Sequence, residues 1–287
     1  MLRFASLLCL LMLEGPARAD PPPTPCQSCA AFNETQKPFR IFGNTYYVGV
    51  RGLSSALLTS SQGHVLIDGD LPESAPKIVE SIRTLGFRVE DVKLILVTHT
   101  HFDHAGGIAE LARLSGARVL ASKRAAPVLR QGKSGPDDPQ YGILLPFPAW
   151  PGTGTFEDGE VLHVGPLAVT ARLTAGHTPG GASYTFSSCE TGRCLNVVYA
   201  DSLNPASAPG FKFTSSPHYP DVLADFERSF QVLSTVPCDI LISAHPDASG
   251  FWDRYERRDF VDPAACKEYV EAARERLKKR VAEERAH

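Results

Sequence analysis

Short runs of hydrophobic residues broken by turn residues begin at Phe39, and they predict β-strands. The expected strands cover residues 40–42, 45–50, 55–60, 64–67, 92–97 and 117–121 in the first half, and 161–164, 167–174, 183–186, 196–199 and 240–243 in the second. Helical periodicity predicts helices over 74–85, 105–115, 222–233 and 263–284, the last with Asp262 as its N-cap and Pro263 in its first turn. Two strand-rich halves covered by helices indicate a layered α/β domain.

The stretch from Gly132 to Gly154 interrupts this pattern. It is rich in Gly, Pro and polar residues and is longer than an ordinary connection between elements. Long loops without structure of their own are often functional, so this segment is a candidate part of a site.

The first nineteen residues have the pattern of a signal peptide. Arg3 precedes an apolar run over residues 4–13, and Ala17-Arg18-Ala19 forms a small-x-small cleavage site. A buried N-terminal helix is the alternative, but Gly15-Pro16 would break it. We therefore expect residues 1–19 to be removed on export, residues 20–38 to form a Pro-rich extension, and residues 39–287 to form one domain.

Six cysteines remain after Cys9 is removed with the signal peptide, an even number in a compartment that permits disulfides. They are Cys26, Cys29, Cys189, Cys194, Cys238 and Cys266. Cys26-x-x-Cys29 has two other interpretations, a redox motif or half of a zinc knuckle. However, it lies in a Pro-rich segment with no strand before it.

The composition narrows the class of protein. Of 287 residues, 43% are hydrophobic and 21% charged, an ordinary globular balance that excludes disorder or coiled coil for the whole chain. A formal net charge of −3 argues against nucleic-acid binding. No apolar run reaches the ~20 residues that span a bilayer, so no membrane-spanning segment is expected.

The strongest chemical signal is a histidine cluster at the end of an apolar strand. His99-Thr-His101-Phe-Asp103-His104 runs from that strand into a helix. Strand-end loops present functional groups in α/β folds, and neutral imidazoles with a carboxylate suit zinc. The alternative, a solvated polar loop, does not explain so dense a set of ligand types.

More distant ligands are expected at two other strand ends. His177 lies in a Gly-rich turn after one strand, and His245 directly follows another. The remaining histidines are expected to be structural or surface residues: His64, His163, His218 and His287.

Asp201-Ser202 follows the strand at 196–199 and also points to the strand-end rim. Since neighbouring residues on a strand face opposite ways, only one of the two is expected to face the metals.

Together these residues resemble the metallo-β-lactamase superfamily, and within it the subclass B3 metallo-β-lactamases. The resemblance runs from Pro38-Phe-Arg-Ile-Phe-Gly-Asn-Thr-Tyr-Tyr-Val-Gly49 to the last helix. The subclass is indicated by the absence of a cysteine near Ser202, by the pair His104 and His245, and by Ala200-Asp-Ser-Leu203. The family fold is an αββα sandwich, which agrees with the two strand-rich halves.

The resemblance implies two zinc ions per chain. It assigns His99, His101 and His177 to the first zinc, and Asp103, His104 and His245 to the second. A hydroxide held by the metals would attack a carbonyl carbon, and Asp103 would orient it. The resemblance also implies disulfides Cys238–Cys266 and Cys189–Cys194, with a Cys26–Cys29 pairing left open.

Two positions depart from the family pattern. Phe32 stands where many members have a tryptophan, and Asn204 where a small hydroxyl residue is common. Both would lie at the substrate rim, where Ser202 is expected to hydrogen-bond the substrate carboxylate, directly or through water. These departures bear on substrate preference rather than on the hydrolytic chemistry.

The function expected from these features is zinc-dependent hydrolysis of the β-lactam bond of antibiotics, by a periplasmic monomer whose partner is a small-molecule substrate. A glyoxalase II-like thioesterase or a lactonase on the same scaffold is the first alternative, and it needs Asp201 to turn inward and join the two metals. A non-enzymatic zinc-binding protein is the second, but structural zinc sites usually close four ligands around one metal.

Overall fold

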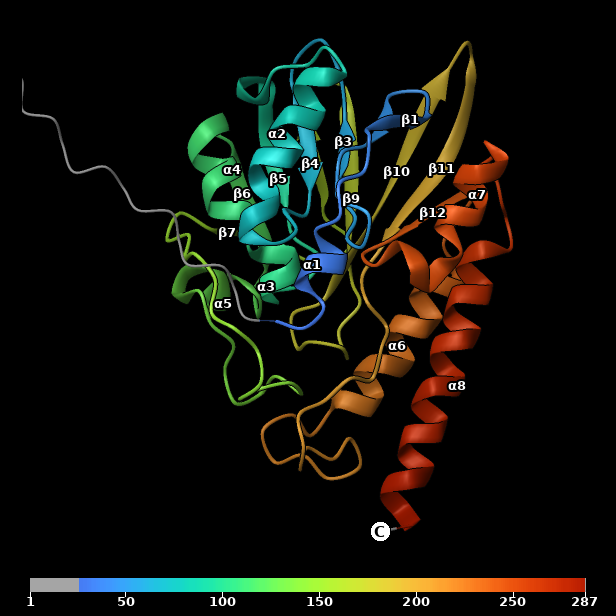
Figure 1. Ribbon diagram of the computed structural model, residues 1–287. Coiled ribbons are helices and arrows are strands. Elements are labelled where there is room, and N and C mark those ends of the chain that lie inside the picture. Colours follow the sequence, from blue (N-terminus) through green and yellow to red (C-terminus); the bar gives the residue numbers. More distant parts are fainter. Residues whose placement is uncertain (1–25, 287) are drawn as a thin grey trace, which may run out of the picture.

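Two β-sheets stack face to face, and helices cover the outer face of each (Figure 1). The structure, a computed structural model, describes residues 26–286. The expected signal peptide, the first part of the Pro-rich extension and His287 lie outside the described residues. The αββα sandwich is confirmed.

The first sheet is formed by the N-terminal half of the chain, and its strands lie in sequence order. They are β1 (Phe39–Phe42), β2 (Thr45–Tyr47), β3 (Ala56–Leu58), β4 (His64–Ile67), β5 (Val92–Leu96), β6 (Arg118–Ser122) and β7 (Gly154–Phe156). Pairing is antiparallel from β1 to β4 and parallel from β4 to β7. The parallel strands need crossover connections, and the helices of this half supply most of them.

The second sheet has the strand order β12-β11-β10-β9-β8. Its strands are β8 (Val161–Val164), β9 (Leu167–Leu173), β10 (Ala182–Glu190), β11 (Arg193–Ala200) and β12 (Ile240–Ser243). Only the β11–β12 pair is parallel. Because β5, β9, β11 and β12 are each followed by a candidate site residue, the ends of these strands decide where the site forms.

Alternate residues of the central strands face different layers. In β4, Val65 and Ile67 pack between the sheets, whereas Leu66 packs under the helices. In β11, Val197 and Tyr199 face the other sheet, and Val198 faces the helices on the far side. Strands buried on both faces read as continuous apolar runs, which is why their sequences are so hydrophobic.

The helical layers are built from amphipathic helices. On the first sheet lie α2 (Ala75–Thr84), α4 (Ile108–Ser115) and α5 (Ala126–Gln131), and on the second lie α6 (Val222–Thr235) and α8 (Ala265–Ala286). Shorter helices complete the chain: α1 (Cys29–Phe32), α3 (Phe102–Ala105), α7 (Phe251–Arg257) and the 3-10 turns η1 (Pro72–Ser74), η2 (Val89–Asp91) and η3 (Pro246–Ser249). No helix among residues 26–286 combines the length and the apolar character that a bilayer crossing requires.

Several expected boundaries are wrong. The helix expected over 105–115 begins at Ile108, as α4, because a separate short helix, α3, ends at Ala105 and the turn Gly106-Gly107 lies between them. A side chain at Gly106 would lie 2.4 Å from Pro72, so glycine allows the close approach of this turn to η1. The last helix begins at Ala265 rather than at Pro263, although the Asp262 carboxylate still accepts a hydrogen bond from the Ala264 amide at 3.2 Å.

The six described cysteines form three disulfides: Cys26–Cys29, Cys189–Cys194 and Cys238–Cys266. Cys189 and Cys194 face each other across the β10–β11 hairpin. Cys238 precedes β12 and Cys266 lies in the first turn of α8, so this bond joins the second sheet to the helix that covers it.

Candidate metal centre

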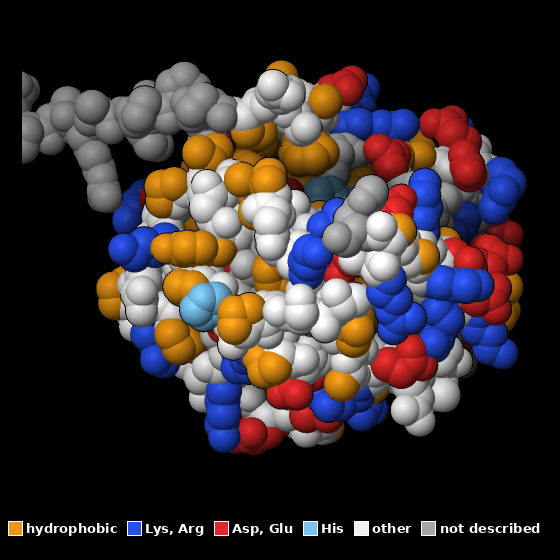
Figure 2. Space-filling model, turned by 90° about the horizontal axis from the view of Figure 1, so that it is seen from below, with side chains coloured by type: hydrophobic (Ala, Val, Ile, Leu, Met, Phe, Trp, Pro, Cys, Tyr) orange, Lys and Arg blue, Asp and Glu red, His pale blue; other side chains and the backbone are white. Residues whose placement is uncertain are grey.

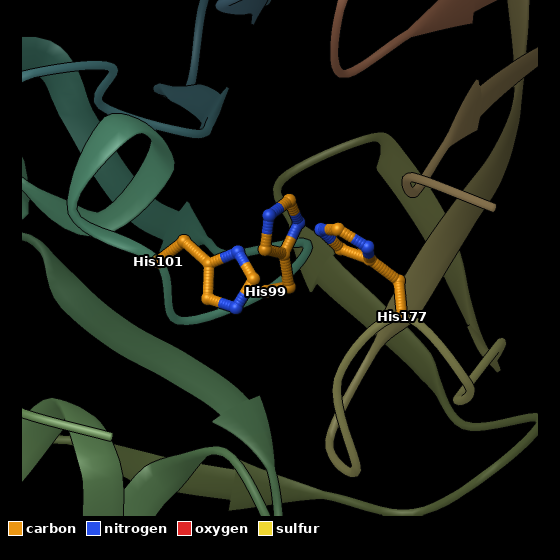
Figure 3. A group of neighbouring side chains, drawn as sticks. All are labelled: His99, His101 and His177. Atoms are coloured by element: carbon orange, nitrogen blue, oxygen red, sulfur yellow. The ribbon is translucent and has the colours of Figure 1, made fainter. Parts of the chain in front are cut away.

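Three histidines from two sheets meet where β5 and β9 end. His99 and His101 follow β5, and His177 lies in the turn between β9 and β10. The ring centroid of His99 is 4.7 Å from that of His101 and 4.8 Å from that of His177, and those of His101 and His177 are also 4.8 Å apart. Figure 3 shows the three rings turned toward one another, so the long-range ligand expected at His177 lies beside the cluster.

A second group lies beside the first. Asp103 and His104 are in α3, and His245 follows β12. The Nε2 atoms of His104 and His245 are 3.1 Å apart, and an Asp103 carboxylate oxygen lies 3.6 Å from each of them. The His99 and His104 rings, 4.1 Å apart, join the two groups. The fold therefore brings together all six side chains that the sequence singled out.

Hydrogen bonds behind the first group determine which ring nitrogens face inward. The Nδ1 atoms of His99 and His177 donate to the Asp201 carboxylate and to the Asn204 carbonyl oxygen, both at 2.7 Å. His101 uses Nε2 instead, which lies 3.1 Å from the Asp138 carboxylate. A histidine that donates from one nitrogen presents a lone pair on the other, so each ring has one nitrogen available as a ligand.

Within residues 26–286, the inward atoms of His99 and His101 have no partner or only a weak one. His99 Nε2 is buried without a hydrogen bond, and the Gln140 amide approaches His101 Nδ1 only at 3.5 Å, the outer limit of a hydrogen bond. Since buried polar atoms are normally paired, these atoms fit a ligand set for a cation. Imidazole nitrogens with one carboxylate are the ligand types that zinc prefers.

Four buried carboxylates surround the histidine rings of the two groups. Asp68, Asp70, Asp103 and Asp201 are all buried, and within residues 26–286 none of them forms an ion pair with a lysine or arginine. Burial raises the pKa of Asp201 well above its ordinary value and that of Asp70 to about 7, because uncompensated negative charge is costly at this depth. The cluster therefore has the electrostatics of a cation site.

Burial keeps most of these histidines neutral. It lowers the pKa of His99 well below the ordinary value, and the neighbouring histidines lower it further. Burial likewise lowers the pKa of His177 to about 3 and that of His245 to about 4. Neutral imidazole is the form that binds metal, so little free energy is needed to deprotonate these ligands at pH 7.

The pKa of His104 is raised rather than lowered. Burial would lower its pKa, but the Asp103 carboxylate, with Asp68 and Asp70 behind it, raises the pKa to about 9. The carboxylates thus favour a positive charge at the point where His104 and His245 meet. A metal ion bound there would take the place of that proton.

The cluster opens into a cavity of about 510 Å³. Its lining residues are Phe32, His101, Phe102, Asp103, Gln140, Leu144, His177, Ser202, Asn204, Ala206, His245, Ala248, Tyr269 and Arg276. Phe32, Ser202 and Asn204 thus lie at the cavity wall, as expected of rim residues. Asp201 is not among them, because its side chain turns behind His99.

Sequence reasoning missed four residues of this region. Asp138 and Gln140, which contact His101, lie in the long loop between Gly132 and Gly154 that was expected to be functional, so that loop was the available signal. Tyr269 and Arg276 come from α8, whose pattern predicts only an amphipathic helix. The three histidines outside the cluster that the structure describes, His64, His163 and His218, do not line the cavity.

Comparison with known proteins gives the family. Residues 48–191 match the metallo-beta-lactamase superfamily. The Rm3 metallo-beta-lactamase is 57% identical with a TM-score of 0.90, over 91% of this chain and 99% of that one. MEM-A1, a subclass B3 metallo-beta-lactamase from a soil metagenome library, is 54% identical with a TM-score of 0.88, over 89% of this chain and 99% of that one.

A more distant curated relative matches only part of the chain. The hydroxyacylglutathione hydrolase of Methylobacterium nodulans is 32% identical over 117 residues, which are 41% of this chain. The match spans only 36% of the length of that relative. The solved structures match nearly the whole described fold, whereas the hydrolase matches a part of it, and on this basis the chain belongs to the metallo-beta-lactamase superfamily and, within it, to the subclass B3 metallo-beta-lactamases.

Proposed function

We propose that this protein is an exported, zinc-dependent enzyme that hydrolyses the amide bond of β-lactam antibiotics. The observation that carries the proposal is a cluster of five histidines and Asp103, of which His101, Asp103, His177 and His245 line an open cavity. A structural zinc site would be closed by four ligands, so this arrangement favours catalysis. The Rm3 and MEM-A1 proteins, with more than half of their residues identical, support the choice of substrate class.

The orientation of Asp201 favours a lactamase over a thioesterase. The glyoxalase II-like alternative needs this aspartate to join the two metals, but its carboxylate accepts the His99 Nδ1–H at 2.7 Å. Ser202, the next residue, lines the cavity in its place. The partial match to hydroxyacylglutathione hydrolase keeps the thioesterase as the competitor to be tested.

We assign His99, His101 and His177 to a first zinc and Asp103, His104 and His245 to a second. Zinc bound there would supply a water that is activated at neutral pH and a Lewis acid for the carbonyl oxygen. The Asp103 carboxylate, at the cavity floor, would accept a hydrogen bond from the attacking water and orient it. No side chain need be acylated.

The cavity wall would hold the substrate. The Ser202 hydroxyl and the Asn204 side chain offer hydrogen-bond donors to an anionic group, whereas Phe32 and Leu144 offer apolar surface to a side chain. The Phe32 ring packs against His245 with their centroids 5.4 Å apart, so this wall lies next to the second ligand group. The disulfides accord with export to an oxidising compartment such as the periplasm.

The test is turnover of a penicillin, a cephalosporin and a carbapenem by the zinc-loaded protein, followed by ultraviolet absorbance. A chelator should abolish turnover and added zinc should restore it, while inhibitors that acylate a catalytic serine should have little effect. Asp103→Asn should lower kcat sharply because it removes the charge that orients the water. Cleavage of a glutathione thioester without cleavage of any β-lactam would contradict the proposal and favour the thioesterase.

A further inference from the structure

One guanidinium lies in the wall of the cavity that holds the candidate ligands. Arg276 of α8 is the only Lys or Arg among the described residues that line it. We propose that Arg276 is a specificity-determining residue whose guanidinium binds the ring carboxylate of the β-lactam. This inference rests on the proposed function and adds, beside the donors Ser202 and Asn204, a charged partner for the anionic end of the substrate.

The position of Arg276 follows from its place on α8. Tyr269, seven residues earlier, is two helical turns away on the same face. The Tyr269 hydroxyl donates to the Asp201 carbonyl oxygen at 2.9 Å and accepts from the Leu203 amide at 3.3 Å. This end of the helix face is therefore fixed against the segment that carries Ser202.

The same face is fixed again beyond Arg276. Arg280, one turn further along α8, donates to the Ser207 hydroxyl at 3.0 Å and to the Phe211 carbonyl oxygen at 3.2 Å. The segment 201–211 thus runs alongside α8 in the same direction as the helix. Arg276 lies between the two contacts, level with Asn204 and Ala206, which line the same cavity.

Among the described residues Arg276 has no charged partner, unlike Arg274 and Arg280 on the same helix. Arg274 pairs with Glu227, and Arg280 pairs with Glu284 at 3.0 Å. No carboxylate within residues 26–286 forms an ion pair with Arg276, and no hydrogen bond holds its guanidinium. Burial raises the pKa of the Tyr269 hydroxyl and the Arg276 charge opposes that shift, so the guanidinium lies within electrostatic reach of this wall.

The polarity of the cavity matches a molecule with one anionic end. Phe32, Phe102 and Leu144 supply apolar surface, and the Asp103 carboxylate at the floor repels an anion. Figure 2 shows the hollow with a histidine at its floor and with both hydrophobic and Lys or Arg side chains around it. An arginine can bind a carboxylate through two parallel N–H···O bonds, so the Arg276 side of the wall is the favoured place for that group.

The experiment compares a cephalosporin that carries its free ring carboxylate with the methyl ester of the same compound, both hydrolysed by the zinc-loaded protein. Arg276→Ala should raise KM for the acid about tenfold and leave kcat within about twofold, because a bond made equally in the ground and transition states is lost. KM for the ester should not change. Arg276→Lys should raise KM for the acid less than Arg276→Ala does, since lysine keeps the positive charge but cannot form two parallel N–H···O bonds.

Lys279→Ala is the matched control, because it removes one positive charge from the same helix outside the cavity lining. It should leave the preference for the acid intact. Isothermal titration with the ring-opened product, which keeps the ring carboxylate, provides a readout independent of turnover, and Arg276→Ala should weaken this binding about tenfold as well.

The outcomes separate this inference from the proposed function. A wild-type preference for the acid that survives in Arg276→Ala would overturn the inference and leave lactam hydrolysis standing. Equal KM values for acid and ester in the wild type would overturn it too, because the carboxylate would then not be recognised. A zinc-loaded wild type that cleaves neither compound would overturn the proposed function, and the inference with it.

Discussion

Asp201 supports the candidate metal ligand His99 without entering the cavity. Its Oδ1 atom accepts the His99 Nδ1–H at 2.7 Å, while its Oδ2 atom is buried with no partner. A side chain at Gly181 would lie 2.2 Å from Oδ2, so only glycine leaves room for the carboxylate there. The hydrogen bond fixes the tautomer and the orientation of His99, which is the task of outer-shell carboxylates in metal sites.

We therefore expect Asp201→Asn to lower zinc affinity about 10- to 100-fold. The asparagine side chain can still accept a hydrogen bond from His99 Nδ1–H. Because it is neutral, it raises the basicity of the imidazole less than the carboxylate does. Competition with a chromogenic chelator measures the affinity of each metal. Asp253→Asn on α7 is the control, since it removes an aspartate that does not line the cavity. An Asp201→Asn protein that holds both metals as tightly as the wild type would show that Asp201 has no such role.

At the scale of helices and strands, the sequence predicts best where periodicity is strong. The expected bounds of β4, β8 and β12 match the structure, because each is a short alternating or fully apolar run closed by turn residues. The short helices α5 and α7 were not expected. α5 has Pro127 in its first turn and α7 begins after Gly250 at a φ of 64°, so both read locally as loops and depend on tertiary packing.

The candidate ligands, too, could be predicted from local pattern, whereas the residues that contact them depend on tertiary packing. The positions of His177 and His245 beside the cluster could be inferred, because each follows a strand end in a chain with an evident histidine cluster. Asp138 could not, because its contact with His101 bridges 37 residues and arises only when the long loop folds over the site. Arg276 was missed for a similar reason, since an exposed arginine on an amphipathic helix is usual and its cavity exists only in the fold.

The disulfide Cys238–Cys266 joins two elements, since it ties α8 to the residue before β12. It closes a loop with a sequence separation of 28, whereas Cys189–Cys194 closes one with a separation of 5. In the chain-entropy model the longer loop stabilises by about 3–4 kcal/mol and the shorter by about 2 kcal/mol. The double variant Cys238→Ala/Cys266→Ala should lose the larger free energy of unfolding in urea.

The double variant Cys189→Ala/Cys194→Ala is the comparison for that measurement. Each variant removes one disulfide, Cys189–Cys194 within the β10–β11 hairpin and Cys238–Cys266 between the second sheet and α8, so the difference between them reports the loop length and the link to α8. A smaller loss for Cys238–Cys266 than for Cys189–Cys194 would contradict the entropic argument.

At the scale of the whole molecule, the candidate ligands join the two halves of the sandwich. His99, His101, Asp103 and His104 come from the half that forms the first sheet. His177 and His245 come from the half that forms the second. A metal bound in either ligand group therefore connects both halves, and an unfolded chain would not hold these groups together.

Zinc should accordingly stabilise the fold as a whole. Free zinc at about a thousand times the dissociation constant stabilises by about 4 kcal/mol per site, which for a chain of this size corresponds to a rise in Tm on the order of 10 °C. Calorimetry of the zinc-loaded protein and of the same protein dialysed against a chelator measures this shift; dialysis leaves the disulfides intact. His177→Ala should lose part of the shift, whereas His163→Ala on the exposed side of β8 should retain it. If metal analysis shows that dialysis has removed the zinc and Tm does not fall, then the metals do not join the two halves.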